Sequence, residues 1–194
     1  MNDYIIKKKS HLVHVSRLDE EWLQNHKEVL LDKIRLLYVG RISAEKGIFN
    51  FIKMLEEIKI KFEFSIVGNL KKYKLSQNNI NLINYVSDTK KLMDVYDRNN
   101  ITILPSYTEG SPNVVNESLS RKRPVIIFED IEYIIKDKKG IFVSKRDPKS
   151  FLDTAKKIIK NYGDIQKEME KNALPTKKNM IKQISDIIKS EVFN

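Results

Sequence analysis

The chain has 194 residues, of which 41% are hydrophobic and 32% charged, a composition typical of one soluble globular domain that can bury a core. It has no cysteine, which excludes disulfides and thiolate metal sites, and no apolar run long enough for a membrane span or a signal peptide. The net charge is +10, but the Lys and Arg residues are spread along the chain and mixed with 26 acidic residues, and no nucleic-acid-binding motif accompanies them. We therefore expect attraction to anionic substrates or an anionic membrane surface rather than to nucleic acid.

The first 33 residues carry little regular pattern. Residues 11–15 could form a short strand, and residues 20–31 a polar helix or a linker. His11, His14 and His26 lack carboxylates at a spacing that would suit a metal site. We therefore expect residues 1–33 to be a linker or a remnant, and residues 34–194 to form the folded domain.

From residue 34 onward, short apolar runs alternate with amphipathic segments. We expect strands at residues 34–39, 62–67, 80–86, 101–104, 125–128 and 140–143. The expected helices include residues 48–58, a helix capped by Ser87, residues 147–162 ended by Gly163, and residues 177–192. This alternation predicts an α/β fold: a Rossmann-like, six-stranded parallel sheet with helices on both faces.

The stretch 105–124 combines a turn with a helix start. Ser111 suits an N-cap, and Pro112 suits the first helical position, where its missing N–H costs nothing. The free N–H groups of Ser111, Asn113 and Val114 would then form an anion site. Gly40, Gly68 and Gly110 also lie just beyond the carboxyl ends of predicted strands, at the sheet edge where open α/β sheets bind ligands.

Two carboxylates, Glu109 and Glu117, flank this helix start. Because carboxylates repel phosphate, their expected partners are the neighbouring hydroxyls of a ribose or a hexose. Each residue alone is more simply explained as a solvated charge, but the pair around an anion site favours a sugar nucleotide. Arg41 and Lys46, on either side of the turn after the first strand, could hold its diphosphate, although surface charges are the simpler explanation for either alone.

These residues resemble a known family. Glu109 and Glu117 stand eight positions apart, as in the E-x7-E signature of the group 1 glycosyl transferases, retaining enzymes with the GT-B fold. The runs 39–41, 46–47 and 104–126 also resemble that family, and the similarity spans roughly residues 34–159. The chain departs from the pattern at Lys122, where the family usually has Gly, and at Ser118, where Ala is usual.

The resemblance implies that residues 34–194 are the donor-binding, C-terminal half of a GT-B enzyme. Residues 1–33 are too few for the acceptor-binding half, so they would be a linker or the remnant of it. In that family, positions matching Arg41 and Lys46 contact the donor phosphates. The match to Glu109 contacts the transferred sugar, and the match to Glu117 holds the ribose. Backbone at Tyr85 and Val86 would border the base.

We therefore expect the chain to bind a nucleoside-diphosphate sugar and, with an N-terminal acceptor domain, to transfer the hexose with retention. The sequence has no Asp-x-Asp pair, and Asp130 and Glu132 suit a solvated loop, so we expect transfer without a metal or other cofactor. The alternative is a non-catalytic nucleotide-sugar-binding module or one subunit of a split enzyme. The expected acceptor is a glycan or a lipid-linked chain, and the expected location is the cytoplasm, with or without contact at the inner membrane face.

Overall fold

The computed structural model describes residues 11, 13, 15–69 and 79–192. Its centre is one sheet of six strands, in the order β3-β2-β1-β4-β5-β6, and every neighbouring pair is parallel. The strands are β1 (Ile34–Val39), β2 (Phe62–Gly68), β3 (Ile80–Asn84), β4 (Ile101–Leu104), β5 (Val125–Phe128) and β6 (Ile141–Ser144). The predicted Rossmann-like sheet is confirmed. The strand order reverses between β1 and β4, the position where such sheets bind ligands.

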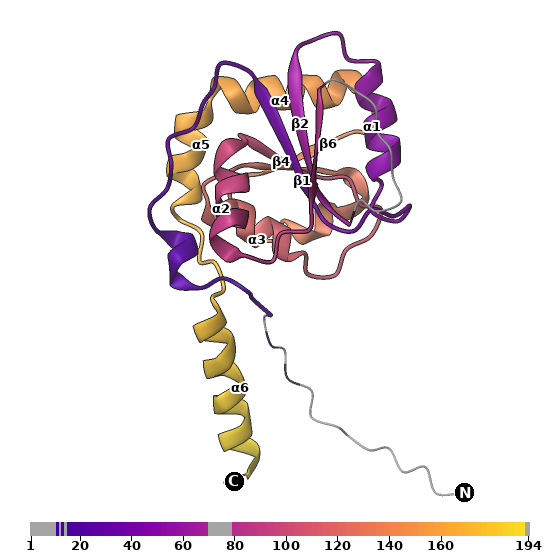
Figure 1. The fold of residues 1–194 in the computed structure, drawn as a ribbon. Coiled ribbons are helices and arrows are strands. Elements are labelled where there is room, and N and C mark those ends of the chain that lie inside the picture. Colours follow the sequence, from indigo (N-terminus) through magenta and orange to yellow (C-terminus); the bar gives the residue numbers. More distant parts are fainter. Residues whose placement is uncertain (1–10, 12, 14, 70–78, 193–194) are drawn as a thin grey trace, which may run out of the picture.

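Helices cover both faces of the sheet (Figure 1). They are α1 (Ile48–Glu56), α2 (Thr89–Arg98), α3 (Asn113–Ser120), α4 (Pro148–Lys160), α5 (Tyr162–Met169) and α6 (Lys177–Val192), with 3-10 turns η1 (Glu20–Leu23) and η2 (Glu129–Ile134). Helices α1 and α4 pack on one face, while α2, α3 and η1 pack on the other. The continuous apolar strands β4 and β5 are buried on both sides, as expected for a parallel sheet.

The core differs between the two faces. On the α1 face, Phe51 lies at the centre of an aromatic cluster. Its ring centroid is 5.4 Å from Phe64, 6.1 Å from Phe128 and 5.1 Å from Phe151, all edge to face. On the opposite face, the aromatic contact is between Trp22 of η1 and Tyr96 of α2, both buried. That second cluster lies beneath the carboxyl ends of β1 and β2.

Several predicted boundaries are wrong by a residue or more. Helix α3 begins at Asn113, because the first turn closes on the carbonyl of Pro112 rather than on that of Ser111. Asp88 rather than Ser87 caps α2, since its carboxylate accepts from the N–H of Lys91 at 2.8 Å. Gly163 does not end a helix, because it lies inside α5, which restarts after the break at Asn161.

The N-terminal stretch contains less regular structure than its sequence allowed. Of residues 20–31, for which the sequence allowed a polar helix or a linker, only η1 is helical, and it is four residues long. The predicted strand at residues 11–15 is not formed by residues 11, 13 and 15, while residues 12 and 14 lie outside the described residues. Nevertheless, Ser16, Leu18 and Trp22 are buried. This stretch therefore packs on the domain, although the boundary proposed at residue 33 stays a prediction.

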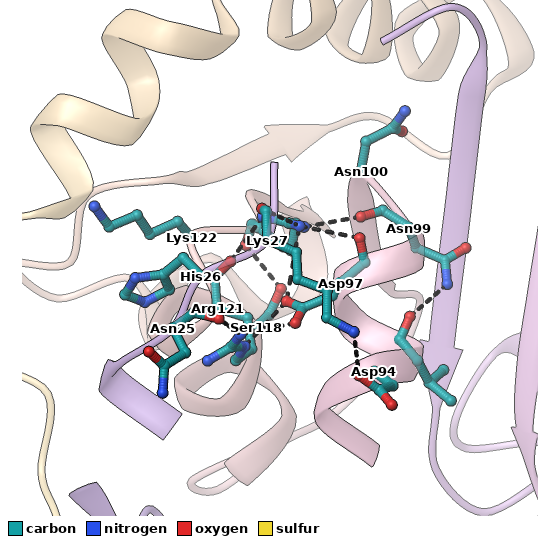
Figure 2. A network of polar contacts seen from close by, with 12 residues as sticks. Asn25, His26, Lys27, Asp94, Asp97, Asn99, Asn100, Ser118, Arg121 and Lys122 are labelled. Carbon is teal, nitrogen blue, oxygen red and sulfur yellow. Dashed lines mark hydrogen bonds and ion pairs between the residues drawn. The ribbon is translucent and has the colours of Figure 1, made fainter. Parts of the chain in front are cut away.

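Two buried arginines hold the N-terminal stretch against α2 and α3 (Figure 2). Arg121 makes two hydrogen bonds to the carboxylate of Asp97, at 3.0 and 2.7 Å, and donates to the carbonyls of Trp22 and Gln24. Arg123 donates to carbonyls of Lys27 and Asp97. Since Arg121 makes five hydrogen bonds and Arg123 makes four, and both lie beside the Asp97 carboxylate, their burial is largely compensated.

Lys122 has a left-handed backbone, with φ of 53°. It occupies the position after the end of α3 where helices usually have glycine, and two backbone bonds close that end: Lys122 N–H to Leu119 and Arg123 N–H to Ser118. This geometry gives the physical reason why glycine suits the position. The Lys122 side chain forms an exposed ion pair with Glu170.

Helix α6 points away from the rest of the fold (Figure 1). It is tied at its start, where the Lys177 N–H donates to the Leu18 carbonyl at 2.8 Å. Ile181, Ile184 and Ile188 along it are exposed. No helix among the described residues has the length and hydropathy needed to cross a membrane.

Candidate functional site

A cleft of about 970 Å³ opens at the carboxyl ends of β1, β2 and β3, beside the start of α3. Its lining includes seven of the residues singled out in the sequence: Gly40, Arg41, Tyr85, Val86, Asn113, Val114 and Glu117. The remainder of the lining is mainly apolar, and Arg17, Trp22 and Asn69 also contribute. An apolar cleft with a few polar groups at the strand-order reversal is the usual form of a small-molecule site.

Glu117 lies at one end of the cleft. Its carboxylate is nearly buried, and its Oε2 accepts the Tyr96 hydroxyl at 2.8 Å. Burial raises the pKa of the Glu117 carboxyl, while the Tyr96 hydrogen bond and the charge of Arg17 oppose that rise. Glu117 therefore lacks a direct ion-pair partner among the described residues, and it remains a strong acceptor for hydroxyl donors in the cleft.

The floor of the cleft requires small residues. A Cβ on Gly68 would lie 2.6 Å from the carbonyl oxygen of Gly40, so the ends of β2 and β1 can approach closely only because residue 68 is a glycine. Just above this floor, Arg41 is exposed and lies 3.7 Å from the Glu45 carboxylate. Its guanidinium is thus at the mouth of the cleft and free to reorient toward a ligand.

Lys46 and Glu109 form an ion pair beside the cleft, at 2.6 Å between Nζ and Oε1. The Ser106 hydroxyl donates to the same oxygen at 2.6 Å. Neither Lys46 nor Glu109 is among the residues that line the cleft. Because the loop that lines the cleft at Arg41 continues to Lys46, the ion pair lies at the far end of one continuous surface loop.

The loop that carries Glu109 is fastened at several points. Arg146 donates to the carbonyls of Pro105 and Ser106 at 2.9 and 2.8 Å. The Tyr133 hydroxyl donates to the Glu109 carbonyl at 2.6 Å and accepts from the Glu109 N–H at 3.0 Å. These bonds fix the backbone of Glu109 as well as its carboxylate.

Gly47 explains how the two loops meet. Its φ is 65°, and a Cβ there would lie 2.0 Å from the Pro105 carbonyl oxygen. Any other residue would push the loops apart and lengthen the contact between Lys46 and Glu109. Gly110 and Ser111, the two remaining sequence candidates, lie on the connection from Glu109 to α3 and do not line the cleft.

Among the residues at this site that the sequence did not identify, Arg17, Tyr96, Ser106 and Tyr133 contact or face the two glutamates. Tyr96 lies on the apolar face of α2, where a sequence pattern gives its hydroxyl no separate signal. Arg17 comes from the stretch interpreted as a linker. Ser106 lies after β4 and three residues before Glu109, a spacing short enough to predict a contact between the two side chains. Tyr133 lies in η2, where sequence patterns do not reveal which way a side chain points.

Among the residues that the structure describes, no three His, Asp or Glu side chains gather where they could hold a metal ion. The expectation of metal-free chemistry stays a prediction. Arg41 and the residues at the start of α3 line the cleft, whereas Lys46 is paired with Glu109 beside it, and the expectation that they hold a diphosphate stays a prediction.

Comparison with known proteins identifies the family. Residues 19–175 match the family model described as glycosyl transferases group 1. The capsular polysaccharide biosynthesis glycosyltransferase CapM of Staphylococcus aureus is 29% identical over 160 residues, which cover 74% of this chain and 40% of CapM. The chain thus spans less than half of that relative.

Solved structures agree on the fold. Sucrose-phosphate synthase from Thermosynechococcus elongatus matches with a TM-score of 0.66 and 17% identity, over 84% of this chain and 46% of the synthase. The Anabaena protein HepE, solved in complex with UDP and glucose, matches with a TM-score of 0.64 and 14% identity, over 82% of this chain and 49% of HepE. The chain therefore belongs to the glycosyl transferases group 1 family, and its sheet is one Rossmann-like half of that family's GT-B fold.

Proposed function

We propose that this chain binds a nucleoside-diphosphate sugar and serves as the donor half of a retaining hexosyltransferase. The observation that carries the proposal is the buried carboxylate of Glu117, hydrogen-bonded to Tyr96 and turned to a cleft at the strand-order reversal. Such a carboxylate offers two acceptor oxygens to a ribose diol. The apolar lining near Tyr85 and Val86 suits the base.

The diphosphate would extend from the ribose toward the loop of Arg41 and Lys46. Transfer breaks the bond between the anomeric carbon and the diphosphate oxygen, which takes the electron pair and gains negative charge. The same carbon forms a bond to the acceptor hydroxyl oxygen, whose proton passes to the leaving diphosphate. Arg41, Lys46 and the start of α3 would compensate that charge without a metal ion. Glu109 would accept hydroxyls of the hexose, and its pairing to Lys46 would link the sugar to the phosphate.

The acceptor would bind elsewhere. Since the chain spans 40% of CapM, the proposed enzyme needs an N-terminal domain that holds a glycan or lipid-linked acceptor. Holding the acceptor hydroxyl at the donor carbon can supply about 7–11 kcal/mol of the barrier. We propose that the complete enzyme works in the cytoplasm, at the inner face of the membrane when its acceptor is lipid-linked.

A second candidate is a module that binds nucleotide sugars without catalysis, alone or as one subunit of a split enzyme. The observation that favours this candidate is that the chain matches only 40% of CapM. The two candidates share the cleft and differ in turnover. Product formation by the purified chain with an added N-terminal partner would support catalysis, whereas saturable binding without turnover in that mixture would support the module.

A thermal-shift panel tests binding directly. UDP-, GDP- and ADP-sugars should be compared with and without a chelator. At a ligand concentration about 100-fold above the dissociation constant, the bound sugar nucleotide should stabilise the chain by about 2.7 kcal/mol. A shift that disappears with chelator would contradict metal-free binding, and the absence of any shift would contradict the proposed function.

A further inference from the structure

Glu117 is supported from behind the cleft by a single buried hydroxyl. The Tyr96 side chain is fully buried, and its OH donates to Glu117 Oε2 at 2.8 Å. The described residues give Oε1 no comparable hydrogen bond. One carboxylate oxygen is therefore held by the protein, while the group as a whole lies at the wall of the cleft.

The position of Tyr96 is itself fixed. Its ring meets the edge of Trp22, with centroids 5.8 Å apart and planes at 70°. The Trp22 carbonyl accepts from Arg121, whose guanidinium also clasps Asp97, the residue after Tyr96 on α2. The pair of Arg121 and Asp97, labelled in Figure 2, thus anchors the neighbour of Tyr96, and Trp22 packs against the Tyr96 ring, so the hydroxyl has little freedom to move.

We propose that Tyr96 is a positioning residue for the ribose contact: its hydroxyl fixes the rotamer of Glu117 and keeps that carboxylate ionised for the diol of the nucleotide. The proposal rests on the proposed function, because it assigns Glu117 to the ribose. It adds a residue that does not itself touch the ligand, since Tyr96 is not part of the cleft lining.

The charge balance explains why Glu117 needs this support. Burial raises the pKa of the Glu117 carboxyl, and two described groups lower it: the Tyr96 hydroxyl from α2 and the Arg17 guanidinium from the N-terminal stretch. Without the hydroxyl, the Glu117 pKa should rise further, because a hydrogen bond to the charged form is lost. Binding that needs the carboxylate should then weaken at a higher pH.

The test compares the wild type with Tyr96→Phe, which removes only the hydroxyl. The probe is whichever of UDP-, GDP- and ADP-glucose binds the wild type most tightly. Its diphosphate is fully ionised throughout, so titration of the ligand does not contribute. Calorimetric titration between pH 5 and 8 should show about 3- to 10-fold weaker binding by Tyr96→Phe near neutral pH. The pH at which affinity falls should also move upward.

Tyr162→Phe is the matched control. Tyr162 is buried too, and its hydroxyl donates to the Asn100 carbonyl at 2.7 Å, in the core on the opposite face of the sheet. It should lose comparable thermal stability yet keep the wild-type affinity and pH profile. In a Glu117→Gln background, Tyr96→Phe should no longer move the pH profile.

The outcomes distinguish failure of the proposed function from failure of the positioning role of Tyr96. If wild type binds none of the three probes, the proposed function fails and this inference falls with it. If wild type binds but Tyr96→Phe has the same affinity and pH profile, the positioning role alone is overturned. Equal losses in Tyr96→Phe and Tyr162→Phe would also overturn it, because general destabilisation would then account for the effect.

Discussion

The two glutamates of the E-x7-E pair lie in opposite electrostatic surroundings. Glu109 is bonded to a cation, to a hydroxyl and, through its backbone, to Tyr133. Glu117 has one neutral hydrogen bond, from Tyr96. Both carboxylates are nearly buried: the side chain of Glu109 is 8% exposed, and Glu117 as a residue is also 8% exposed.

This contrast indicates different tasks. Glu109 has its charge balanced inside the protein, because its carboxylate pairs with Lys46 and accepts the Ser106 hydroxyl; in the proposed function it would align the hexose of the ligand. Glu117 is incompletely compensated, so hydroxyl donors from a ligand would relieve the cost of its burial. Stability should therefore depend on the partners of Glu109, and ligand affinity should depend strongly on Glu117.

The largest effect expected from this contrast is the loss of folding stability caused by Lys46→Met. Removing the ammonium leaves Glu109 nearly buried without a cation, and we expect a loss of about 2–4 kcal/mol in the free energy of unfolding. Urea denaturation of wild type and variant measures it. The control is Arg41→Met, whose pair with Glu45 is exposed, so its loss should leave stability almost unchanged. Similar losses in both variants would contradict the assigned difference in burial.

The second effect concerns ligands. Glu117→Gln should weaken a nucleoside diphosphate and its sugar conjugate alike, because both contain ribose. Glu109→Gln should weaken mainly the conjugate, because its proposed contact is to the hexose. Losses of about 1–3 kcal/mol are expected if each removes charged hydrogen bonds. Calorimetry of both ligands with both variants measures them, and equal losses in all four titrations would show that the roles are wrongly divided.

The sequence predicted the centre of the sheet well because strands β4 and β5 are buried on both faces. The run 125–128 is wholly apolar and the run 101–104 is apolar except for Thr102, and they end at a polar residue and a proline, so their bounds are sharp. The helix termini were less accurate. Ser87 and Asp88 are both good caps, and only the local backbone decides that Asp88 accepts the Lys91 N–H.

The partners of the two glutamates could not be predicted because they come from distant parts of the chain. The Lys46 pair spans 63 positions, and the Tyr96 hydrogen bond spans 21. Sequence patterns record which residues are apolar or charged, but not which loops meet. Gly47 shows this limit: a glycine permits a close backbone approach, but only the structure shows that it is Pro105 that approaches.

A third effect is on the pH dependence of stability. Burial raises the folded-state pKa of Glu117 above its unfolded value, so protonation favours folding. Its contribution is therefore fully present below the unfolded pKa and is lost as pH rises through the folded pKa. Relative to Glu117→Gln, wild type should lose stability over that rise. Urea denaturation at a series of pH values measures the difference.

Glu170→Gln provides a comparison of opposite sign. Lys122 lowers the pKa of Glu170 in the folded state. Its contribution is present above the unfolded pKa and is lost as pH falls through the folded value. A wild-type advantage over Glu117→Gln that grew with pH, as expected for Glu170, would mean that Glu117 is better compensated than its contacts indicate.

The smallest expected effect is that of Lys122→Gly, which should change folding stability without changing ligand affinity. Lys122 follows α3, the helix that carries Glu117, and its left-handed backbone costs roughly 1–2 kcal/mol in an L-residue. Lys122→Gly removes that strain but gains unfolded-chain entropy and loses a surface ion pair, so we expect a net gain of about 0.5–1 kcal/mol. Because the backbone bonds that close α3 remain, Glu117 should not move, and affinity for both ligands should stay at the wild-type value. Thermal unfolding and calorimetry of the same preparation test both parts. A net loss of stability would mean that the contact with Glu170 outweighs the backbone strain, and a change in affinity would mean that the end of α3 also positions Glu117.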